Sequence, residues 1–404
     1  MDYAILACFA VVYAGMMFGR LPGLALDRTG VALLGAIALL ALGKLSLAEA
    51  VASVDIPTIA LLFGLIVLSA QFRLGGFYSR TARALGQRES SPEMLLALLI
   101  VSSGVLSAVL ANDIVCLAMT PVMAEGCLRR GLNPKPFLLA LACAANVGSA
   151  ATLIGNPQNM LIGQSLQLDF LTYVWQAGPP SAVGLAIVWF IIARQTRGHW
   201  YTNSRDLTVE SPPYNSWETT KGMVILVLVL AAFIAAPWPR DLVALAAAGA
   251  LLCSRRMRSR DMLGLVDWQL ILLFISLFAV NHALAESGAL ASITAGLSAW
   301  RIDISSPIWL FGLSTVLSNL VSNVPAVMLL LPSATHSLAG PVLALSSTLA
   351  GNLIVVGSIA NIIVIDQAAR QGISIGWKEH ARTGVPVTLA TLAAAAAWLL
   401  FVAV

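Results

Sequence analysis

Two stretches of the chain, one in each half, place amide, hydroxyl and carboxylate side chains inside long apolar runs. In the first half, Ala111-Asn112-Asp113 interrupts such a run, and residues 146–159 follow with the sequence NVGSAATLIGNPQN. In the second half, Ser322-Asn323-Val324 interrupts another run, and residues 351–361 follow with GNLIVVGSIAN. Polar groups of these types can bind small ions or polar solutes, and polar groups inside a membrane mark a functional site.

The two polar stretches repeat at nearly constant spacing. Asn112 and Asn323 are 211 residues apart, and Asn159 and Asn361 are 202 residues apart. A membrane chain with corresponding interrupted apolar segments in its two halves is typical of secondary transporters built from internal repeats.

The first of these segments contains its own helix breaker. Pro157 has no backbone donor and disfavours helix at Asn156, and Gly155 loosens the chain further. Unwound backbone at membrane depth is tolerated where protein buries it or where it lines a wet cavity. The half-helix ends that result attract anions through free N–H groups and cations through carbonyl and amide oxygens.

The predicted binding residues for substrate or ion come from the two tips and the two breaks. They are Asn112, Asp113, Thr152, Gly155, Asn156, Asn159, Ser322, Asn323, Gly357, Ser358 and Asn361. We expect Asn112, Asn159, Asn323 and Asn361 to surround one cavity, with Gly155, Gly357 and Ser358 giving close backbone approach. The alternative is helix–helix contact through buried amides, which would account for Asn146 and Asn352.

Asp113 is the most centrally placed acid of the chain. A carboxylate inside the membrane is a candidate for proton coupling, and a sodium ion near Asn112, Asp113 and Asn159 is the alternative. A structural role, hydrogen-bonded to the hairpin backbone, is the other interpretation. Arg and Lys are absent from the predicted chamber, and the nearby Cys116 is expected to behave as a small apolar residue.

Composition sets the protein class. Of 404 residues, 59% are hydrophobic and 10% are charged, and the mean hydropathy is +0.87. Soluble domains are about one quarter charged, so the chain is predicted to be an all-α polytopic membrane protein. The net charge of +4 reflects loop arginines and indicates no nucleic-acid surface. Five scattered cysteines argue against a disulfide framework or a zinc site.

Charge in the loops predicts the topology, because loops rich in Arg and Lys stay in the cytoplasm. The basic loops are 20–28, 73–88, 129–135, 194–221, 255–260 and 370–382. Segment 94–125 has basic loops at both ends, so we predict a re-entrant hairpin with Asn112-Asp113 at its tip. Segment 305–334 has few charges at either end and is predicted to be a hairpin entering from outside. About ten full spans then alternate consistently, with both termini outside.

The halves are predicted to be repeats of opposite orientation joined by a polar cytoplasmic linker. Their ranges are 1–195 for the first repeat, 196–220 for the linker and 221–404 for the second repeat. Segment 241–253 is short for a full span. The basic stretch 80–88 and its apolar counterpart 289–300 are expected to be helices along the membrane interface, with an ordinary loop as the alternative.

Several motifs resemble one known superfamily. Ala111-Asn112-Asp113 followed by Thr120-Pro121 resembles the hairpin tip of arsenite permeases. Residues 153–159 resemble the first broken helix of YbiR-type permeases, and residues 357–384 resemble the C-terminal repeat of arsenite permeases. The chain as a whole therefore resembles the ion transporter superfamily, in the branch of arsenite permeases, CitMHS transporters and YbiR-like anion permeases.

The resemblance implies inverted repeats, re-entrant hairpins, broken transmembrane helices, an elevator-like movement and homodimers. One departure bears on the substrate. The sodium–dicarboxylate branch carries Ser-Asn-Thr at both tips, where this chain has Ala-Asn-Asp and Ser-Asn-Val.

Together these features predict a secondary active transporter of a small anion or oxyanion in the inner or plasma membrane. Arsenite-like efflux with proton coupling is favoured. The alternatives are a sodium/proton antiporter and a sodium-coupled dicarboxylate or citrate-type symporter. The sequence contains no intramembrane His-x-x-x-His pair and no convincing Ser/His dyad, which argues against an intramembrane enzyme. We expect no catalytic residue and no cofactor besides H⁺ or Na⁺ as coupling ion.

Overall fold

The computed structural model describes residues 2–19, 25–203, 209–210, 212–254, 257–289, 292, 295–296, 299 and 301–403. Within these residues every named element is a helix. The first half contains α1 (Tyr3–Phe18), α2 (Arg28–Ala41), α3 (Leu47–Ser53), α4 (Ile56–Leu74), α5 (Phe77–Gln87), α6 (Pro92–Val109), α7 (Asn112–Arg129), α8 (Pro134–Ser149), α9 (Pro157–Ser165) and α10 (Phe170–Thr196).

The second half continues the chain from Ser216. It contains α11 (Ser216–Ala235), α12 (Arg240–Leu252), α13 (Ser259–Leu263), α14 (Trp268–Glu286), α16 (Pro307–Val321), α17 (Asn323–Leu330), the 3-10 turn η1 (Leu331–Ser333), α18 (Ala339–Ala350), the 3-10 turn η2 (Val355–Gly357), α19 (Ile359–Arg370) and α20 (Trp377–Val402). The expected linker 196–220 therefore ends early, because the side chain of Asn215 caps α11 by accepting from the Glu218 N–H.

Six helices are long and apolar enough to cross a membrane, which makes the protein an integral, multi-pass membrane protein. They are α4, α6, α10, α11, α14 and α20. The remaining apolar helices are shorter, among them α12 with 13 residues at the predicted short segment 241–253. The number of crossings and the side of each terminus remain predictions.

The predicted interruptions occur where the sequence placed them. Segment 94–125 folds back on itself as α6 and α7, with the turn at Leu110 and Ala111. The two outer ends of this hairpin meet, because Nη2 of Arg130 donates to the carbonyl of Ser90 at 2.7 Å. In the second half, Ser322 separates α16 from α17.

Both predicted helix breaks are present as unwound loops. The first lies between α8 and α9, and the second, which contains η2, lies between α18 and α19. The basic stretch 80–88 is largely helical, as α5, and buries one face that includes Tyr78 and Gly86. Its counterpart 289–300 lies mostly outside the described residues.

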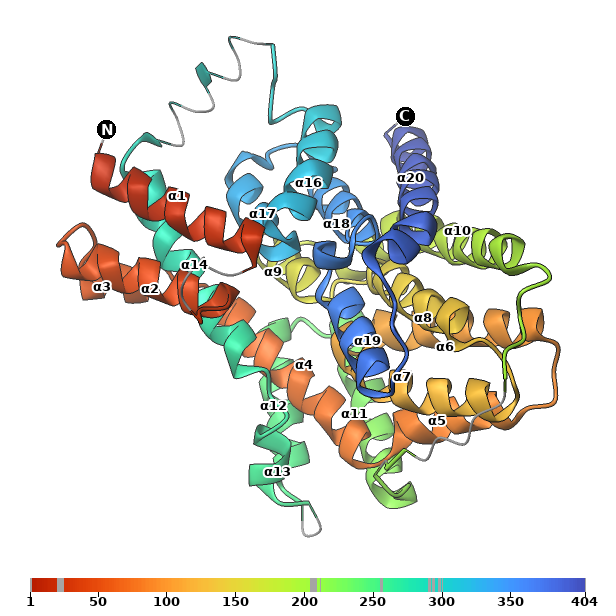
Figure 1. The fold of residues 1–404 in the computed structure, drawn as a ribbon. Coiled ribbons are helices and arrows are strands. Elements are labelled where there is room, and N and C mark those ends of the chain that lie inside the picture. Colours follow the sequence, from red (N-terminus) through yellow and green to blue (C-terminus); the bar gives the residue numbers. More distant parts are fainter. Residues whose placement is uncertain are drawn as a thin grey trace.

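Contacts between helices recur in matched pairs across the two halves (Figure 1). The pairs are α1–α2 with α11–α12, α2–α14 with α12–α4, α6–α8 with α16–α18, α8–α10 with α18–α20, and α7–α19 with α17–α9. Three contacts join a helix to its own counterpart: α4–α14, α8–α18 and α10–α20. This pattern is the one that two repeats related by a two-fold axis are expected to give, so the repeats remain a prediction that the contacts favour.

Candidate functional site

A small cavity lies where the two hairpin tips meet the two helix breaks. Its volume is about 30 Å³, room for a water molecule or two or a small ion. The lining residues are Asn112, Asp113, Asn156, Pro157, Gln158, Leu270, Ser322, Asn323, Val324, Ser358 and Ile359. The structure thus brings together six of the predicted binding residues, drawn from both halves.

Each hairpin tip is hydrogen-bonded to the glycine in the helix break of its own half, Gly155 or Gly357. The backbone N–H of Asn112 donates to the carbonyl of Gly155 at 3.4 Å. In the amide orientation that satisfies its neighbours, Nδ2 of Asn323 donates to the carbonyl of Gly357 at 3.2 Å and to that of Ser347 at 3.1 Å. Each tip asparagine therefore rests on the break of its own half.

These two glycines have no room for a side chain. A Cβ at Gly155 would lie 2.3 Å from the carbonyl oxygen of Ser149 and 2.7 Å from that of Ser107. A Cβ at Gly357 would lie 2.8 Å from Oδ1 of Asn319 and 3.0 Å from the carbonyl oxygen of Gly351. Both glycines permit close packing of the hairpin against the break, and neither lines the cavity, contrary to the prediction from the sequence.

Asn159 and Asn361 do not line the cavity, and each instead holds its unwound loop together. Each donates through Nδ2 to backbone carbonyls ten and seven residues earlier, at 3.3 and 2.9 Å for Asn159 and at 2.8 and 3.2 Å for Asn361. The acceptors are Ser149 and Thr152 in the first loop and Gly351 and Ile354 in the second. Both side chains are almost completely buried, so the structure places them as braces of the breaks.

Asn146 of α8 braces the break of the other half. Its Nδ2 donates to Oδ1 of Asn361 at 3.2 Å and to Oδ1 of Asn352 at 2.8 Å. Its Oδ1 accepts from the hydroxyl of Ser358 at 2.8 Å. Asn146 and Asn352 therefore join helices through buried amides, as the alternative interpretation of the sequence held.

Thr348 of α18, in the second half, forms hydrogen bonds that brace the first break. Its hydroxyl donates to Oδ1 of Asn159 at 3.4 Å and accepts from Nδ2 of Asn156 at 3.3 Å and from Nε2 of Gln158 at 3.2 Å. Thr348 follows Asn146 by the same 202 residues that separate Asn361 from Asn159. The bracing is thus duplicated in geometry although the residue types differ.

Thr152 ties the first break to the hairpin. Its hydroxyl donates to the carbonyl of Ala108, near the end of α6, and accepts from the N–H of Ile154 at 3.2 Å. It does not line the cavity, so among the predicted site residues it belongs with the bracing groups.

The cavity itself is not symmetric. Asp113 occupies the first turn of α7, whereas Val324 takes the matching place in α17. Gln158 donates to Oδ1 of Asn323 at 3.3 Å in the same amide orientation, and its counterpart in the second half is Ala360. The carboxylate and the extra amide both come from the first half.

Asn112, which precedes Asp113 in the sequence and also lines the cavity, offers a side-chain acceptor. Among the described residues, Oδ1 of Asn112 is buried and has no hydrogen-bond partner. A buried polar atom without a partner destabilises the fold by about 1–3 kcal/mol. No basic side chain lines the described part of the cavity, so the site offers a cation or a proton-bearing group an oxygen-rich environment.

The backbone is strained at the turn of the second hairpin and unstrained at the turn of the first. Ser322 has φ 77° and ψ 159°, a conformation that is essentially restricted to glycine. The corresponding turn residue Ala111 has φ −58°. Such a conformation costs about 1–3 kcal/mol and persists only where the surroundings enforce it.

Sequence reasoning missed three contributors. Gln158 lies inside the quoted polar run, and Thr348 lies at the 202-residue offset from Asn146, so both carried a signal. Tyr173 carried none: its hydroxyl accepts from Nδ2 of Asn159 at 3.1 Å and donates to the carbonyl of Ala150 at 2.9 Å. Across the described ranges, no three His, Cys, Asp or Glu residues are placed to hold a metal ion.

Comparisons with known proteins agree on a family. The model of a family described as citrate transporter (CitMHS) matches residues 13–342. The chain is 29% identical to the inner membrane protein YbiR of Escherichia coli, over 81% of this chain and 84% of that protein. It is 27% identical to the silicon efflux transporter LSI3 of Oryza sativa subsp. japonica, over 95% of each.

A solved structure has a similar fold. The crystal structure of the YdaH transporter of Alcanivorax borkumensis superposes with a TM-score of 0.61 over 99% of this chain and 97% of that chain. The sequence identity is 15%, so this likeness concerns the fold.

Proposed function

Because the chain belongs to the citrate transporter (CitMHS) family, we propose that it is a secondary active transporter that binds a small anion or oxyanion between its two hairpin tips. One observation carries this proposal. The cavity at the tips draws polar groups from both halves, and the buried amides of Asn159 and Asn361 brace the two unwound loops beside it. Transporters of this kind bind substrate near the midplane, where broken helices expose backbone groups.

The lining chemistry favours a small hydroxylated oxyanion of the arsenite type over citrate. The polar groups present are amides, hydroxyls and the carboxyl of Asp113, with no arginine or lysine among them. A tricarboxylate would bring several negative charges into a buried site without compensation, which is strongly unfavourable. Arsenite, like dissolved silicon, is a small hydroxylated acid that amides and hydroxyls can bind. The relative named for silicon efflux fits this substrate class.

Asp113 is the proposed coupling residue, and H⁺ is the proposed coupling ion. It is the acid among the described residues that line the cavity, and it lies in the first turn of the hairpin arm α7. The proposed movement of the hairpin would expose it to each side in turn. A second candidate function is sodium/proton antiport, favoured because Oδ1 of the neighbouring Asn112 is buried and has no hydrogen-bond partner in the described part of the chain. A sodium-coupled dicarboxylate or citrate-type symporter is the third, and the charge of the lining argues against it.

Alternating access requires that the cavity open to each side in turn. The proposed moving unit comprises the hairpins and broken helices, α6–α10 and α16–α20, which would slide as an elevator against the remaining helices. In the proposed assembly those remaining helices also form a homodimer in the inner or plasma membrane. No resident cofactor takes part.

Counterflow in proteoliposomes tests the substrate class. Purified protein is loaded with unlabelled arsenite, antimonite, sulfate, citrate, succinate or sodium, and uptake of the matching tracer is followed. We expect arsenite and antimonite to exchange at least about tenfold above protein-free vesicles, and citrate and succinate to stay at background. Exchange of sodium alone would instead establish the antiporter, and exchange of citrate would contradict the charge argument.

Cysteine labelling tests the topology that the mechanism needs. Arg83 and Arg130 line the same pocket at the outer ends of the first hairpin. Cysteines introduced there, in a chain without its native cysteines, should both react only from the cytoplasm. A cysteine at Ser333, after the second hairpin, should react only from outside. Opposite sides for positions 83 and 130 would refute the hairpin, and a cytoplasmic position 333 would refute the inverted orientation of the repeats.

A further inference from the structure

Two arginines at equivalent positions of the predicted repeats each join a helix outside the proposed moving unit to that unit. Arg28 is the first residue of α2, and Arg240 is the first residue of α12, 212 positions later. Nη2 of Arg240 donates to the carbonyl of Leu168 at 2.5 Å and to that of Gly163 at 3.4 Å, around the end of α9. Nη2 of Arg28 donates to the carbonyl of Val356 at 3.4 Å, inside the second helix break. The two arginines therefore hold the moving unit at two different levels.

These two attachment points are not counterparts of each other. The end of α9 corresponds to the end of α19, because the same closing turn occurs in both. The N–H of Leu168 donates to the carbonyl of Gly163 at 3.1 Å, and the N–H of Ile373 donates to that of Ala368 at 3.0 Å. A symmetric arrangement would place Arg28 at the end of α19, yet Arg28 lies at the second break. The moving unit is therefore displaced along the helices that carry the arginines.

The two helix breaks differ in exposure in the way that this displacement requires. Val356 in the second break is 45% exposed, whereas its counterpart Ile154 in the first break, 202 positions earlier, is 1% exposed. At these residues the second break is thus open to its surroundings beside Arg28, and the first break is enclosed by protein.

The cavity lies at the end of α14 that is cytoplasmic in the predicted topology. Leu270, the third residue of α14, lines the cavity, and α14 follows the basic loop 255–260. The counterpart of α14 is α4, which also has 19 residues and an aspartate N-cap. Thr58 is the third residue of α4. It does not line the cavity, and its hydroxyl is buried with no hydrogen-bond partner in the described part of the chain. In this topology the moving unit is thus displaced toward the cytoplasm.

We propose that the structure is the cytoplasm-facing end state of the transport cycle, and that the outward-facing state forms when the two arginines exchange their attachment points. This inference rests on the proposed function and on the predicted repeats. In the outward state Arg240 binds the carbonyl of Ile154 in the first break, and Arg28 binds the carbonyls at the end of α19. The cavity then meets the hydroxyl of Thr58 in place of Leu270, which adds a polar contact for the solute on the outer side.

The exchange gives the two states similar free energies, which alternating access needs. A guanidinium that lost its acceptors during the movement would keep unpaired donors, and their cost would oppose the movement. Arg28 and Arg240 are both half-buried, so acceptors at the new position remove this cost. Because the two arginines interchange their roles, the number of guanidinium hydrogen bonds is the same in both states.

Cross-linking in proteoliposomes tests the exchange without substrate. Cysteine pairs are introduced into the full-length chain without its native cysteines and treated with a short bifunctional thiol reagent that spans the length of an arginine side chain. The pair R28C with V356C reports the state described here. The pair R240C with I154C can be linked only after the exchange, because Ile154 is enclosed in this state.

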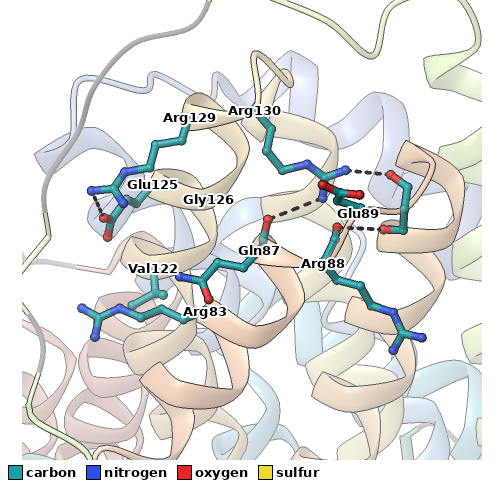
Figure 2. A pocket seen from close by; sticks show the side chains of 11 residues that line it. Arg83, Gln87, Arg88, Glu89, Val122, Glu125, Gly126, Arg129 and Arg130 are labelled. Atoms are coloured by element: carbon teal, nitrogen blue, oxygen red, sulfur yellow. Dashed lines mark hydrogen bonds and ion pairs between the residues drawn. The ribbon is translucent and has the colours of Figure 1, made fainter.

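A control pair and three glutamine substitutions make the readout specific. The control pair, S90C with R130C, joins the two ends of the first hairpin, where Nη2 of Arg130 donates to the carbonyl of Ser90 (Figure 2). R240Q is added to the first reporter pair and R28Q to the second, so that each removes the arginine that holds two carbonyls in the state being reported. R258Q, in another basic loop, is the control substitution.

We expect both reporter pairs to link in the same preparation. R240Q should slow the first pair and R28Q the second by at least about threefold, because hydrogen bonds from a charged donor are lost from that state. R258Q should slow neither, and the control pair should be insensitive to all three substitutions. Failure of the 240–154 pair to link, or equal slowing by R258Q, would overturn the exchange. Arsenite counterflow without a 240–154 link would overturn this inference and leave the proposed function standing. Linking of both pairs without arsenite exchange would support the exchange and refute the proposed substrate.

Discussion

Replacement of Asp113 by asparagine is expected to abolish uphill transport driven by a pH gradient while substrate exchange continues. The asparagine keeps the size of the side chain and its hydrogen-bonding capacity at the cavity, but it cannot take up or release a proton. If the proton crosses on this carboxyl group, substrate and proton affinities are linked, and removing one partner removes the coupling. Net accumulation should fall to the level of protein-free vesicles, and counterflow should stay within about threefold of wild type.

The measurement compares the two modes in the same proteoliposomes. Asp366→Asn is the matched control, because Asp366 is an exposed acid that pairs with Arg370 on the surface of α19. It should retain both modes. Wild-type accumulation by D113N would exclude Asp113 from coupling and leave it a structural role. Loss of both modes in D113N would instead place the carboxylate in substrate binding itself.

The interruptions of the helices were predictable because their causes are local. Pro157 and Gly155 disfavour a continuous helix, and basic loops on both sides of an apolar segment argue against a single crossing. The structure places the turns at Ala111 and Ser322 accordingly. The 3-10 turn η2 in the second break was not predicted, since no proline marks it.

The sequence did not predict which asparagines line the cavity and which hold the unwound loops. Asn112 and Asn323 line the cavity, whereas Asn159 and Asn361 do not line it and hold loop carbonyls. All four are asparagines at repeated positions in apolar surroundings, so the sequence treats them alike. Only the folded structure shows that Asn159 and Asn361 also accept through Oδ1 from Thr348 and Asn146, each in the other half.

The strained backbone at Ser322 is a further property that residue types alone do not predict. A serine at φ 77° violates the local preference of the chain. Such a conformation persists where the surrounding tertiary structure enforces it. Where local preference and tertiary structure disagree, the disagreement is typical of functional sites, and here it lies at the cavity.

These distinctions give opposite expectations for two pairs of alanine substitutions. Asn159→Ala and Asn361→Ala should destabilise the protein strongly. Asn159→Ala removes the bonds to two loop carbonyls and to the crossing hydroxyl of Thr348. Asn361→Ala removes the bonds to the carbonyls of Gly351 and Ile354 and to Nδ2 of Asn146, and the carbonyl of Ile354 then keeps the N–H of Gly357. Each buried group left unpaired costs about 1–3 kcal/mol. Asn112→Ala removes an amide whose Oδ1 has no partner among the described residues, so its melting temperature should remain near that of wild type while transport falls to background.

Thermal unfolding in detergent, followed together with counterflow, separates the two classes. Asn361→Asp isolates the contribution of the bonds to the loop. Its side chain still accepts from Nδ2 of Asn146, but it cannot donate to the carbonyls of Gly351 and Ile354. It should therefore be nearly as unstable as the alanine variant. If Asn112→Ala unfolded as readily as Asn361→Ala, the tip asparagines would belong to the helix contacts, and the cavity would lose its standing as the binding site. If Asn361→Ala instead stayed stable and lost transport, the brace would be the binding group, and substrate would have to reach below the present cavity.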